Sequence, residues 1–487
     1  MRKYNIERNI DFNILSQEEI ELIHEKSLEL IETVGMKICG EHAQEALKAK
    51  GVTFDENDIA KIPRALIMEA LETVPKEIKL YNRMGEEQMV LNSENRVYWG
   101  THSDQLEIVD PYTNKARPFM KADTEMMGKI ADYLPNIDFV LSVGLTKDVD
   151  PKIQTITTFI ETLKNFTKVI NFSTNDVDTL QDIVDIAAVV AGGLDKLQEK
   201  PFIFNYCEPI PPLTHPVEST EKLYLACTNM IPTVYMPYCM MGGTSPINRP
   251  TTLVQCNAEV LIGVLLSQLF KKGAPYIYGA MPSIFDMRTT IGSYAAPEFH
   301  LLVAASSELA NFYNIPFYGT GPCSDAKTVD IQSCTESSYQ VLSTILSKAN
   351  LIHDTGVLDH CNSVSPVMVL VANELINSYN SYSKGVTADE KTIDLSLITK
   401  VGHGGHHLNE KNTLKKFKKE VWYPEYYSRK MKNDDESQIM TMMVDKIKDI
   451  MENHEIPALP DDVLAKIDKI YEDYKERIYN TNTELAK

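Results

Sequence analysis

A glycine-rich turn in the second half of the chain holds the densest group of side chains that could do chemistry. The run 315–336 begins with an apolar burst, turns at Gly319 and Gly321, and then presents Asp325 and Glu336 around a stretch that reads as helix. Carboxylates placed here could serve as acids, bases or substrate-binding groups, because (β/α)8 barrels build their sites at the carboxyl ends of strands. The alternative is an ordinary strand-to-helix connection whose glycines supply a positive φ.

Tyrosines recur where other predicted strands end. Tyr206, Tyr235, Tyr278 and Tyr318 all stand at such ends, and methionines follow several of them. The negative face of an aromatic ring attracts a quaternary ammonium group, which has no N–H to donate. Alternatively, the tyrosines point into the barrel core or lie between strands and helices. Because they cluster at strand ends, we predict an aromatic-walled site for a cation.

Histidines offer a second kind of chemistry. His353 ends a predicted buried strand beside Asp354, where it is either a core histidine or a polar group that faces the substrate. The segment 401–408 contains three more histidines, but its glycines disfavour the continuous helix of a His-Glu-x-x-His metal site. We therefore predict no bound metal. A metal-dependent hydrolase on the same barrel, using these histidines or Asp325, is the alternative.

A regular alternation of apolar runs and helical stretches would position these groups. We predict an α/β fold, a (β/α)8 TIM barrel over residues 121–385, with an eighth strand between about 357 and 372. A doubly wound open sheet is the alternative, and the lack of a Gly-x-Gly-x-x-Gly turn weakens its dinucleotide-binding form. The candidate strands are 139–144, 169–173, 202–207, 233–238, 275–280, 317–319 and 349–354.

Two further regions flank the predicted barrel. Residues 1–120 are expected to form a helical N-terminal region, starting after Ser16, with a small antiparallel β element near its end. Residues 386–487 are charged and are expected to form a helical C-terminal extension. This extension could support self-association or the docking of another protein, or it could be a solvated face. We expect a homo-oligomer.

Composition limits the classes of partner. The formal net charge of −20 argues against binding nucleic acid through its phosphates. The chain has no run of 18 or more apolar residues, and its start lacks the apolar core of a signal peptide. We therefore predict a cytoplasmic protein that binds neither nucleic acid nor membrane.

Several motifs together resemble one known family. They are the start Leu-Ser-Gln-Glu-Glu-Ile at Leu15, the run Ser-Asp-Ala-Lys at Ser324 with Glu336 behind it, the run Ala-Asn-Leu-Ile-His ending at His353, and Gly-His-Gly-Gly-His-His-Leu at Gly402. With these motifs the chain resembles, over most of its length, the trimethylamine methyltransferase superfamily of corrinoid-dependent enzymes. Because only standard residues are present, it looks most like the members without pyrrolysine, which demethylate quaternary amines such as betaines.

The resemblance implies a fold, a reaction and a partner. It implies a (β/α)8 barrel with the substrate at its mouth and a cognate corrinoid protein docked over it. The methyl group would pass from a quaternary amine to Co(I) of the corrinoid (cobalamin) that this partner carries, in C1 metabolism of the methanogenic or acetogenic type. This chain itself would bind no cofactor. Glycine betaine, proline betaine, carnitine and γ-butyrobetaine are all open as substrates.

The resemblance also implies site positions, which join those predicted from the residues. Tyr98, Asp325, Glu336 and His353 are carried over from the family, and Asp325, Glu336 and His353 are the predicted catalytic residues. A quaternary ammonium needs an aromatic cage more than an acid catalyst, because its amine leaves without taking up a proton. Arg288 or His353 could neutralise a betaine carboxylate. The predicted substrate-binding residues are Tyr98, Trp99, Tyr206, Tyr235, Tyr278, Arg288 and Tyr318.

Overall fold

Eight parallel strands form a closed ring at the centre of the protein. The computed structural model describes residues 12–92, 97–101, 104–142, 144–429 and 438–485. Strand β18 pairs with β5, and a parallel bridge between Gly100 and Phe139 joins β5 to β8, so the eight-stranded sheet closes on itself. The (β/α)8 barrel is confirmed. In chain order the strands are β5 (Tyr98–Trp99), β8 (Phe139–Leu141), β9 (Val169–Ser173), β10 (Ile203–Cys207), β12 (Thr233–Tyr235), β14 (Tyr276–Gly279), β17 (Phe317–Thr320) and β18 (Leu351–His353).

The eighth strand lies where the sequence did not lead us to expect it. The expected position between 357 and 372 was wrong, because this segment holds the short strands β19 (Val357–Leu358) and β20 (Ser363–Val364) and the start of a helix. The missing strand is β5, whose apolar run at 97–99 falls in the region where we expected a small antiparallel β element. In fact Tyr98 and Trp99 pair in parallel with Leu351 and Ile352. The division of the chain at residues 120 and 385 stays a prediction, although the first barrel strand precedes residue 120.

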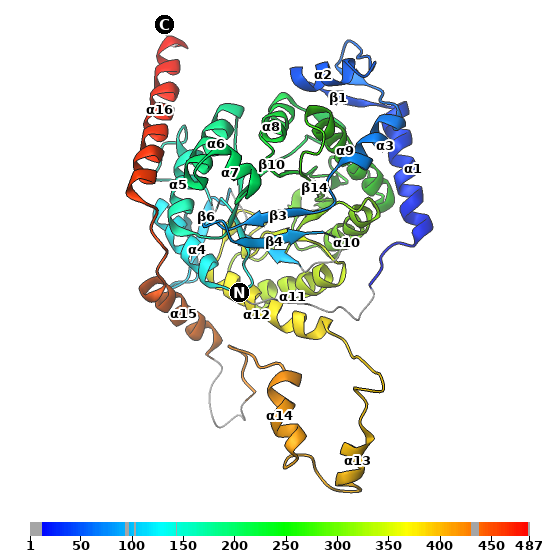
Figure 1. The fold of residues 1–487 in the computed structure, drawn as a ribbon, viewed down its shortest axis with the longest axis vertical. Coiled ribbons are helices and arrows are strands. Elements are labelled where there is room, and N and C mark those ends of the chain that lie inside the picture. The colour runs from blue at the N-terminus through cyan, green and yellow to red at the C-terminus, as the bar shows by residue number, and fades with distance from the viewer. Residues whose placement is uncertain (1–11, 93–96, 102–103, 143, 430–437, 486–487) are drawn as a thin grey trace.

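A helix follows each strand and packs on the outside of the ring (Figure 1). By length and composition α9 (Arg249–Phe270) could cross a membrane, but 83% of its most apolar window is buried inside the protein. It packs against α1 (Gln17–Thr33), α3 (Arg64–Thr73), α8 (Val217–Thr228) and α10 (Pro297–Phe312). It is therefore a core helix. The eight helices are α4 (Lys121–Tyr133), α5 (Gln154–Asn165), α6 (Val177–Ala191), α8 (Val217–Thr228), α9 (Arg249–Phe270), α10 (Pro297–Phe312), α11 (Ile331–Leu346) and α12 (Pro366–Ser383), and a short helix α7 (Leu194–Glu199) follows α6.

A β-hairpin covers the amino-terminal end of the barrel. Strands β3 (Ile78–Tyr81) and β4 (Glu87–Leu91) cross this end, and the amide of Tyr81 donates to Pro201 O at 2.9 Å. The amide of Arg83 likewise donates to Thr167 O at 3.0 Å. Pro201 and Thr167 immediately precede β10 and β9. Because the hairpin occupies this end, the carboxyl-terminal end is the one left for a substrate.

The N-terminal region begins as the sequence predicts. Ser16 Oγ accepts a hydrogen bond from Glu19 N, and Glu19 Oε2 accepts one from Ser16 N, so a capping box starts the first helix. Helices α1 (Gln17–Thr33), α2 (Glu41–Lys48) and α3 (Arg64–Thr73) pack on α9, and α2 also packs on α8. Strand β1 (Met36–Ile38) pairs with β2 (Ile59–Ala60) and with β11 (Thr214–His215).

The C-terminal region contains one segment that leaves the body of the protein. We call residues 386–424 the arm; it carries α13 (Leu395–Val401) and α14 (Lys411–Glu420), neither of which has a buried residue. Figure 1 shows both helices projecting away from the barrel. The chain then returns, and α15 (Ile439–Asn453) packs on α4 and α12 while α16 (Asp461–Leu485) packs on α6.

Closure of the barrel depends on the absence of a side chain at Gly100. A Cβ there would lie 2.3 Å from Cε2 of Phe139 on the neighbouring strand, and buried Phe139 has no open space to move into. We expect Gly100→Ala to lower the free energy of unfolding by about 2 kcal/mol or more, measured by urea denaturation. Gly243→Ala is the control, because its Cβ would meet only ordinary contacts at 3.4 Å and beyond. Equal stability of the two variants would contradict this account of closure.

Candidate active site

Loops that follow the barrel strands build walls around the carboxyl-terminal mouth. After β12 and β14 come β13 (Met240–Met241), β15 (Ser283–Asp286) and β16 (Ile291–Ser293), which form a three-stranded sheet. After β5 come β6 (Glu107–Asp110) and β7 (Lys115–Pro118), which join β19 and β20 from the loop after β18 in a four-stranded sheet. Both sheets therefore arise at the end of the barrel that the hairpin leaves open.

A cavity of about 370 Å³ lies within these walls. Its lining combines tyrosine rings, sulfur-containing side chains and three charged groups. Most of these residues stand at or just after the carboxyl ends of β9, β10, β12 and β14, as a barrel site requires. The lining residues are Asp104, Ser173, Tyr206, Cys207, Glu208, Lys222, Tyr238, Met281 and Tyr294.

Three tyrosines supply the aromatic part of the lining. The rings of Tyr238 and Tyr294 are 6.1 Å apart between centroids and inclined by 32°. Tyr206 donates a hydrogen bond from its hydroxyl to Glu208. Burial raises the pKa of all three phenols. They therefore stay neutral at physiological pH and present ring faces, which attract cations, together with hydroxyl dipoles.

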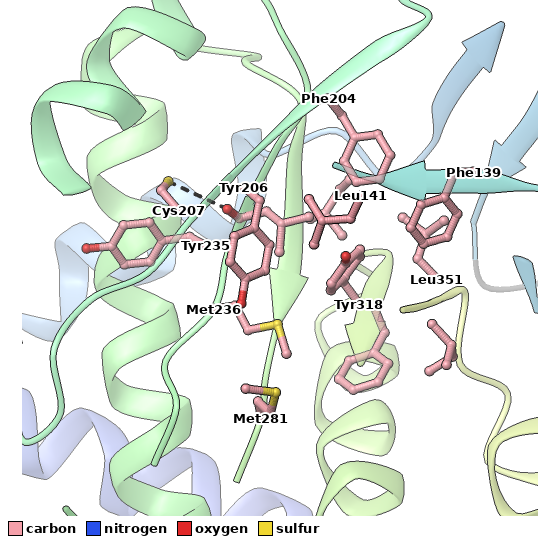
Figure 2. Close-up of a cluster of buried hydrophobic side chains, with 14 of the residues drawn as sticks. Phe139, Leu141, Phe204, Tyr206, Cys207, Tyr235, Met236, Met281, Tyr318 and Leu351 are labelled. Atoms are coloured by element: carbon pink, nitrogen blue, oxygen red, sulfur yellow. Dashed lines mark hydrogen bonds between the residues drawn. The ribbon is translucent and has the colours of Figure 1, made fainter. Parts of the chain in front are cut away.

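The barrel interior beneath Tyr206 is also aromatic. Tyr206 and Tyr318 have centroids 6.0 Å apart, and the ring of His353 lies 4.8 Å from that of Tyr318. Figure 2 shows Tyr206 and Tyr318 next to each other in the buried cluster, with Met281 below Tyr206 in this view. Tyr318 donates its hydroxyl to Asn171 Oδ1 at 2.9 Å, which fixes its ring from the other side of the barrel. The interior thus forms a packed floor for the cavity.

A buried carboxylate lies in this floor. Asp354 is completely buried, its backbone has a φ of +79°, and it accepts a hydrogen bond from Thr320 Oγ1. Asp354 Oδ1 lies 3.4 Å from Nε2 of His353, whose ring centroid is 6.1 Å from that of the lining residue Tyr206, so the carboxylate is close to the lining. Such a backbone conformation is strained for most residues and is tolerated best by Gly, Asn and Asp. The strain is consistent with a position shaped by function.

His353 is held in one tautomer next to this carboxylate. Its Nδ1 lies 2.7 Å from Gly319 O, and since a carbonyl oxygen can only accept, Nδ1 carries the proton. Its Nε2 lies 3.4 Å from Asp354 Oδ1, and both side chains are fully buried. Of the predicted catalytic residues, His353 is therefore the one that lies in the barrel interior beneath the cavity.

Asp325 and Glu336 act on the wall of the cavity. Asp325 Oδ1 accepts a hydrogen bond from the backbone amide of Tyr294 at 2.9 Å, and Ser293 donates to the other oxygen. Glu336 Oε2 in turn accepts from the amide of Asp325 at 3.0 Å. Neither carboxylate belongs to the lining. The two residues hold the loop that presents Tyr294, so their place in the structure is that of positioning residues.

The predicted tyrosines divide between the two faces of the barrel. Tyr206 and Tyr318 point inward, whereas Tyr235 and Tyr278 point outward to the helices. Tyr235 Oη lies 2.8 Å from His215 Nδ1, and Tyr278 Oη donates to Asn257 Oδ1 of α9 at 2.8 Å. Figure 2 shows Tyr235 directed away from Tyr206. The alternative that some tyrosines pack between strands and helices therefore holds for Tyr235 and Tyr278.

The remaining predicted binding residues lie away from the cavity. Tyr98 Oη accepts a hydrogen bond from Val90 N at 3.1 Å, so it reaches the hairpin at the opposite end of the barrel. Trp99 is buried, and because side chains alternate along a strand it points to the other face from Tyr98. Arg288 is exposed in the turn between β15 and β16. The structure brings none of these three residues into the lining.

Of the lining residues only Tyr206 was among the predicted site residues, so Lys222, Tyr238 and Tyr294 are among those that were missed. Tyr294 lies in a loop, where no periodic signal marks it. Lys222 does have a signal, because α8 buries Ser219, Leu223 and Ala226, and a lysine at position 222 shares that face. A lysine on the buried face of a helix is unusual enough to mark a site.

No metal centre is assembled in the described part of the chain. There, no group of three or more His, Cys, Asp and Glu side chains is close enough to hold a metal ion. His403, His406 and His407 are exposed on the arm, whereas His353 is inside the barrel. The histidines that the hydrolase alternative combined are therefore not brought together, and the absence of a bound metal stays a prediction.

Comparison with known proteins places the chain in a family. The family model described as trimethylamine methyltransferase (MTTB) matches residues 2–478. A trimethylamine methyltransferase MttB of Desulfitobacterium hafniense is 30% identical over 400 residues, which cover 82% of this chain and 80% of the relative. A glycine betaine methyltransferase of the same species is 28% identical over 417 residues, covering 85% and 86%.

A solved structure supports the fold. The hydroxylamine complex of MtmB superimposes with a TM-score of 0.51 at 12% identity, covering 97% of this chain and 90% of that one. The likeness extends over nearly the whole chain and not the barrel alone. Because the family model spans almost the full sequence and the barrel agrees with it, the chain belongs to the trimethylamine methyltransferase (MTTB) family and is a methyltransferase.

Proposed function

We propose that this methyltransferase moves a methyl group from a quaternary amine to Co(I) of a corrinoid carried by a separate, cognate protein. The observation that carries the proposal is the cavity at the barrel mouth, whose neutral phenol rings and nearby buried carboxylate suit a cation. Family membership and the glycine betaine methyltransferase among the relatives support the reaction class. This chain itself binds no cofactor in the proposal.

The proposed reaction requires positioning more than acid–base catalysis. Co(I) would supply the electron pair that forms the new bond to the methyl carbon. The C–N bond breaks, and its electron pair stays on nitrogen, so a neutral tertiary amine leaves without a proton. The chain must therefore hold one methyl group in line with the incoming metal. A fixed wall made by Tyr238 and Tyr294, braced through Asp325, supplies such a rigid surface.

The same cavity must bind the cation without trapping it. Positive charge disappears from nitrogen as the reaction proceeds, so any group that binds the charge strongly also raises the barrier. Ring faces attract a cation by about 0.5–2 kcal/mol each, which is modest. Asp354 is not part of the lining, but it is fully buried beside His353, whose ring centroid lies 6.1 Å from that of Tyr206. We infer that the rings make the contact with the ammonium group and that Asp354 strengthens it from a distance.

The corrinoid protein is proposed to dock over the mouth. The opposite end of the barrel is covered by the β3–β4 hairpin through hydrogen bonds to Pro201 and Thr167. A macrocycle too large to enter a cavity of about 370 Å³ can therefore approach the substrate only from the carboxyl-terminal side. A cytoplasmic location and the lack of nucleic-acid and membrane partners remain part of this proposal.

We also propose that the chain self-associates through the arm, so that a second copy of the chain covers the exposed apolar side chains of the arm. Five lysines give α14 a positive charge, whereas the whole chain has a net charge of −20, so a second copy offers an acidic partner surface. The arm gathers more exposed large apolar side chains in one place than monomeric proteins usually do. They are Val386, Ile393, Leu395, Ile398, Leu408, Leu414, Phe417, Val421 and Tyr423.

The reaction is tested with the chain, a reduced Co(I) corrinoid protein and a panel of quaternary amines. We expect the corrinoid absorbance to change on methylation with at least one quaternary amine. Tyr238→Leu removes a ring from the cavity and should lower kcat/KM by about 30-fold, since a desolvated cation–π contact contributes about 2 kcal/mol. Tyr224→Leu is the control, because Tyr224 stacks on His42 outside the barrel. No methylation with any amine would reject the proposed reaction.

Direct binding tests the role of the buried carboxylate. Asp354→Asn keeps the side-chain shape and tolerates a φ of +79°, but removes the negative charge. We expect binding of tetramethylammonium chloride, measured by titration calorimetry, to weaken about 10-fold, equivalent to about 1.4 kcal/mol. Asp359→Asn is a matched control, since Asp359 also has a positive φ but pairs with Lys327 outside the cavity. Unchanged binding in Asp354→Asn would remove this carboxylate from the cation site.

Self-association is tested by sedimentation velocity. Leu414→Glu places a charge on the exposed apolar face of the arm and should convert the oligomer to monomers, because an interface does not accept an unpaired buried charge. Ile331→Glu changes an equally apolar residue that is 86% exposed on α11 and should leave the oligomer intact. A monomeric wild-type protein, or an unchanged oligomer in Leu414→Glu, would contradict a role for the arm.

A further inference from the structure

Lys222 is a buried ammonium group in the wall of the cavity. It lies on α8, its exposed fraction is 8%, and its Nζ donates a hydrogen bond to Thr174 O at 2.7 Å. Thr174 follows directly after β9, so Nζ sits at the carboxyl ends of the barrel strands. Lysine is almost never buried to this extent without a partner of opposite charge.

The described part of the chain gives the ammonium group of Lys222 no partner of opposite charge. Among the residues that the structure describes, no carboxylate lies within ion-pairing distance of its Nζ, and Thr174 O uses only one of its three N–H donors. Lys168 provides a contrast, because its Nζ donates to three carbonyl oxygens, those of Ala131, Leu134 and Ile137. Taking a charge out of water without such compensation costs several kcal/mol. The arrangement therefore fits an anionic group that arrives with a ligand.

We propose that Lys222 is the residue that binds the carboxylate of a betaine substrate, and that it thereby makes the cavity prefer a zwitterion to a simple quaternary or tertiary amine. This inference rests on the proposed methyl transfer from a quaternary amine. The two ends of the lining then prefer groups of opposite charge. Tyrosine rings and the nearby Asp354 attract the ammonium group, and Lys222 attracts the carboxylate.

The other charges near the mouth favour this single orientation. Asp104 and Glu208 also line the cavity, and both side chains are exposed, so among the described residues Lys222 is the one cationic side chain of the lining and the group there that attracts a carboxylate. A plain cation would meet the uncompensated charge of Lys222 and bind less well. Arg288 cannot take over this role, because it is exposed in the turn after β15 and is absent from the lining. Lys222 is thus a specificity-determining residue.

Binding to the isolated chain tests the assignment without any corrinoid. Glycine betaine, proline betaine, carnitine and γ-butyrobetaine are titrated by calorimetry, each beside its methyl ester, and tetramethylammonium is titrated as the cation without a carboxylate. We expect wild type to bind at least one betaine 10- to 100-fold more tightly than its ester, since a hydrogen bond to a charged group has this strength. In Lys222→Met that preference should vanish while the affinity for tetramethylammonium is kept or increases.

Two matched variants and the ester series separate a binding role from a structural one. Lys222→Arg keeps the charge and should retain part of the preference for the free carboxylate. Lys76→Met also removes a partly buried lysine that donates to backbone carbonyls, those of Leu71 and Tyr313, and should change nothing. If Lys222→Met does not fold, the comparison of each betaine with its ester in wild type still decides, because equal affinities overturn the inference.

The outcomes also separate this inference from the proposed reaction. A wild-type enzyme that methylates the corrinoid from tetramethylammonium but prefers no betaine over its ester would overturn the role of Lys222 and leave methyl transfer intact. Tight betaine binding that depends on Lys222, without methylation of the corrinoid by any amine, would support the carboxylate site and overturn the proposed reaction.

Discussion

A closed barrel of short parallel strands gives each side chain only two directions, and the remainder of the site follows from that constraint. Side chains alternate between the interior and the helix layer, so one step along a strand decides whether a residue can meet a substrate. On β10 this places Tyr206 inside, and on β14 it places Tyr278 outside against α9. The ring closes only because Gly100 leaves room for Phe139.

This constraint also explains how far the sequence could predict the structure. Seven of the eight strands could be located because each is an apolar run followed by a helix. The two residues of β5 could not be assigned, because a burst at 97–99 carries no sign of its distant partner Leu351. For the tyrosines, clustering at strand ends was visible, but the register that sends Tyr206 inward and Tyr235 outward depends on pairing between strands. Register is a property of the whole sheet and not of one segment.

The motif from Ser324 to Glu336 shows why a conspicuous sequence need not contact a ligand. Its two carboxylates face backbone amides, and their effect reaches the cavity through Tyr294. Glu336 fixes the amide of Asp325, and Asp325 fixes the amide of Tyr294. Two successive hydrogen bonds therefore fix Tyr294 in the wall of the cavity, which the loop alone would not hold in place. The sequence identified the motif, but it could not reveal which residue the motif supports, because Tyr294 lies on a different loop.

In the methyl transfer and carboxylate binding that we propose, charge gives the two ends of the cavity different tasks. The ammonium charge vanishes as the C–N bond breaks, so contacts to it must be weak enough to be lost without a large rise in the barrier. Ring faces meet that condition, and in the proposal the buried carboxylate of Asp354 adds to their attraction without contacting the ammonium group. The substrate carboxylate keeps its charge from ground state to transition state, so its attraction to Lys222 is the same in both. Strong binding at that end therefore lowers KM without slowing the chemical step, and this is where a methyltransferase can place its affinity.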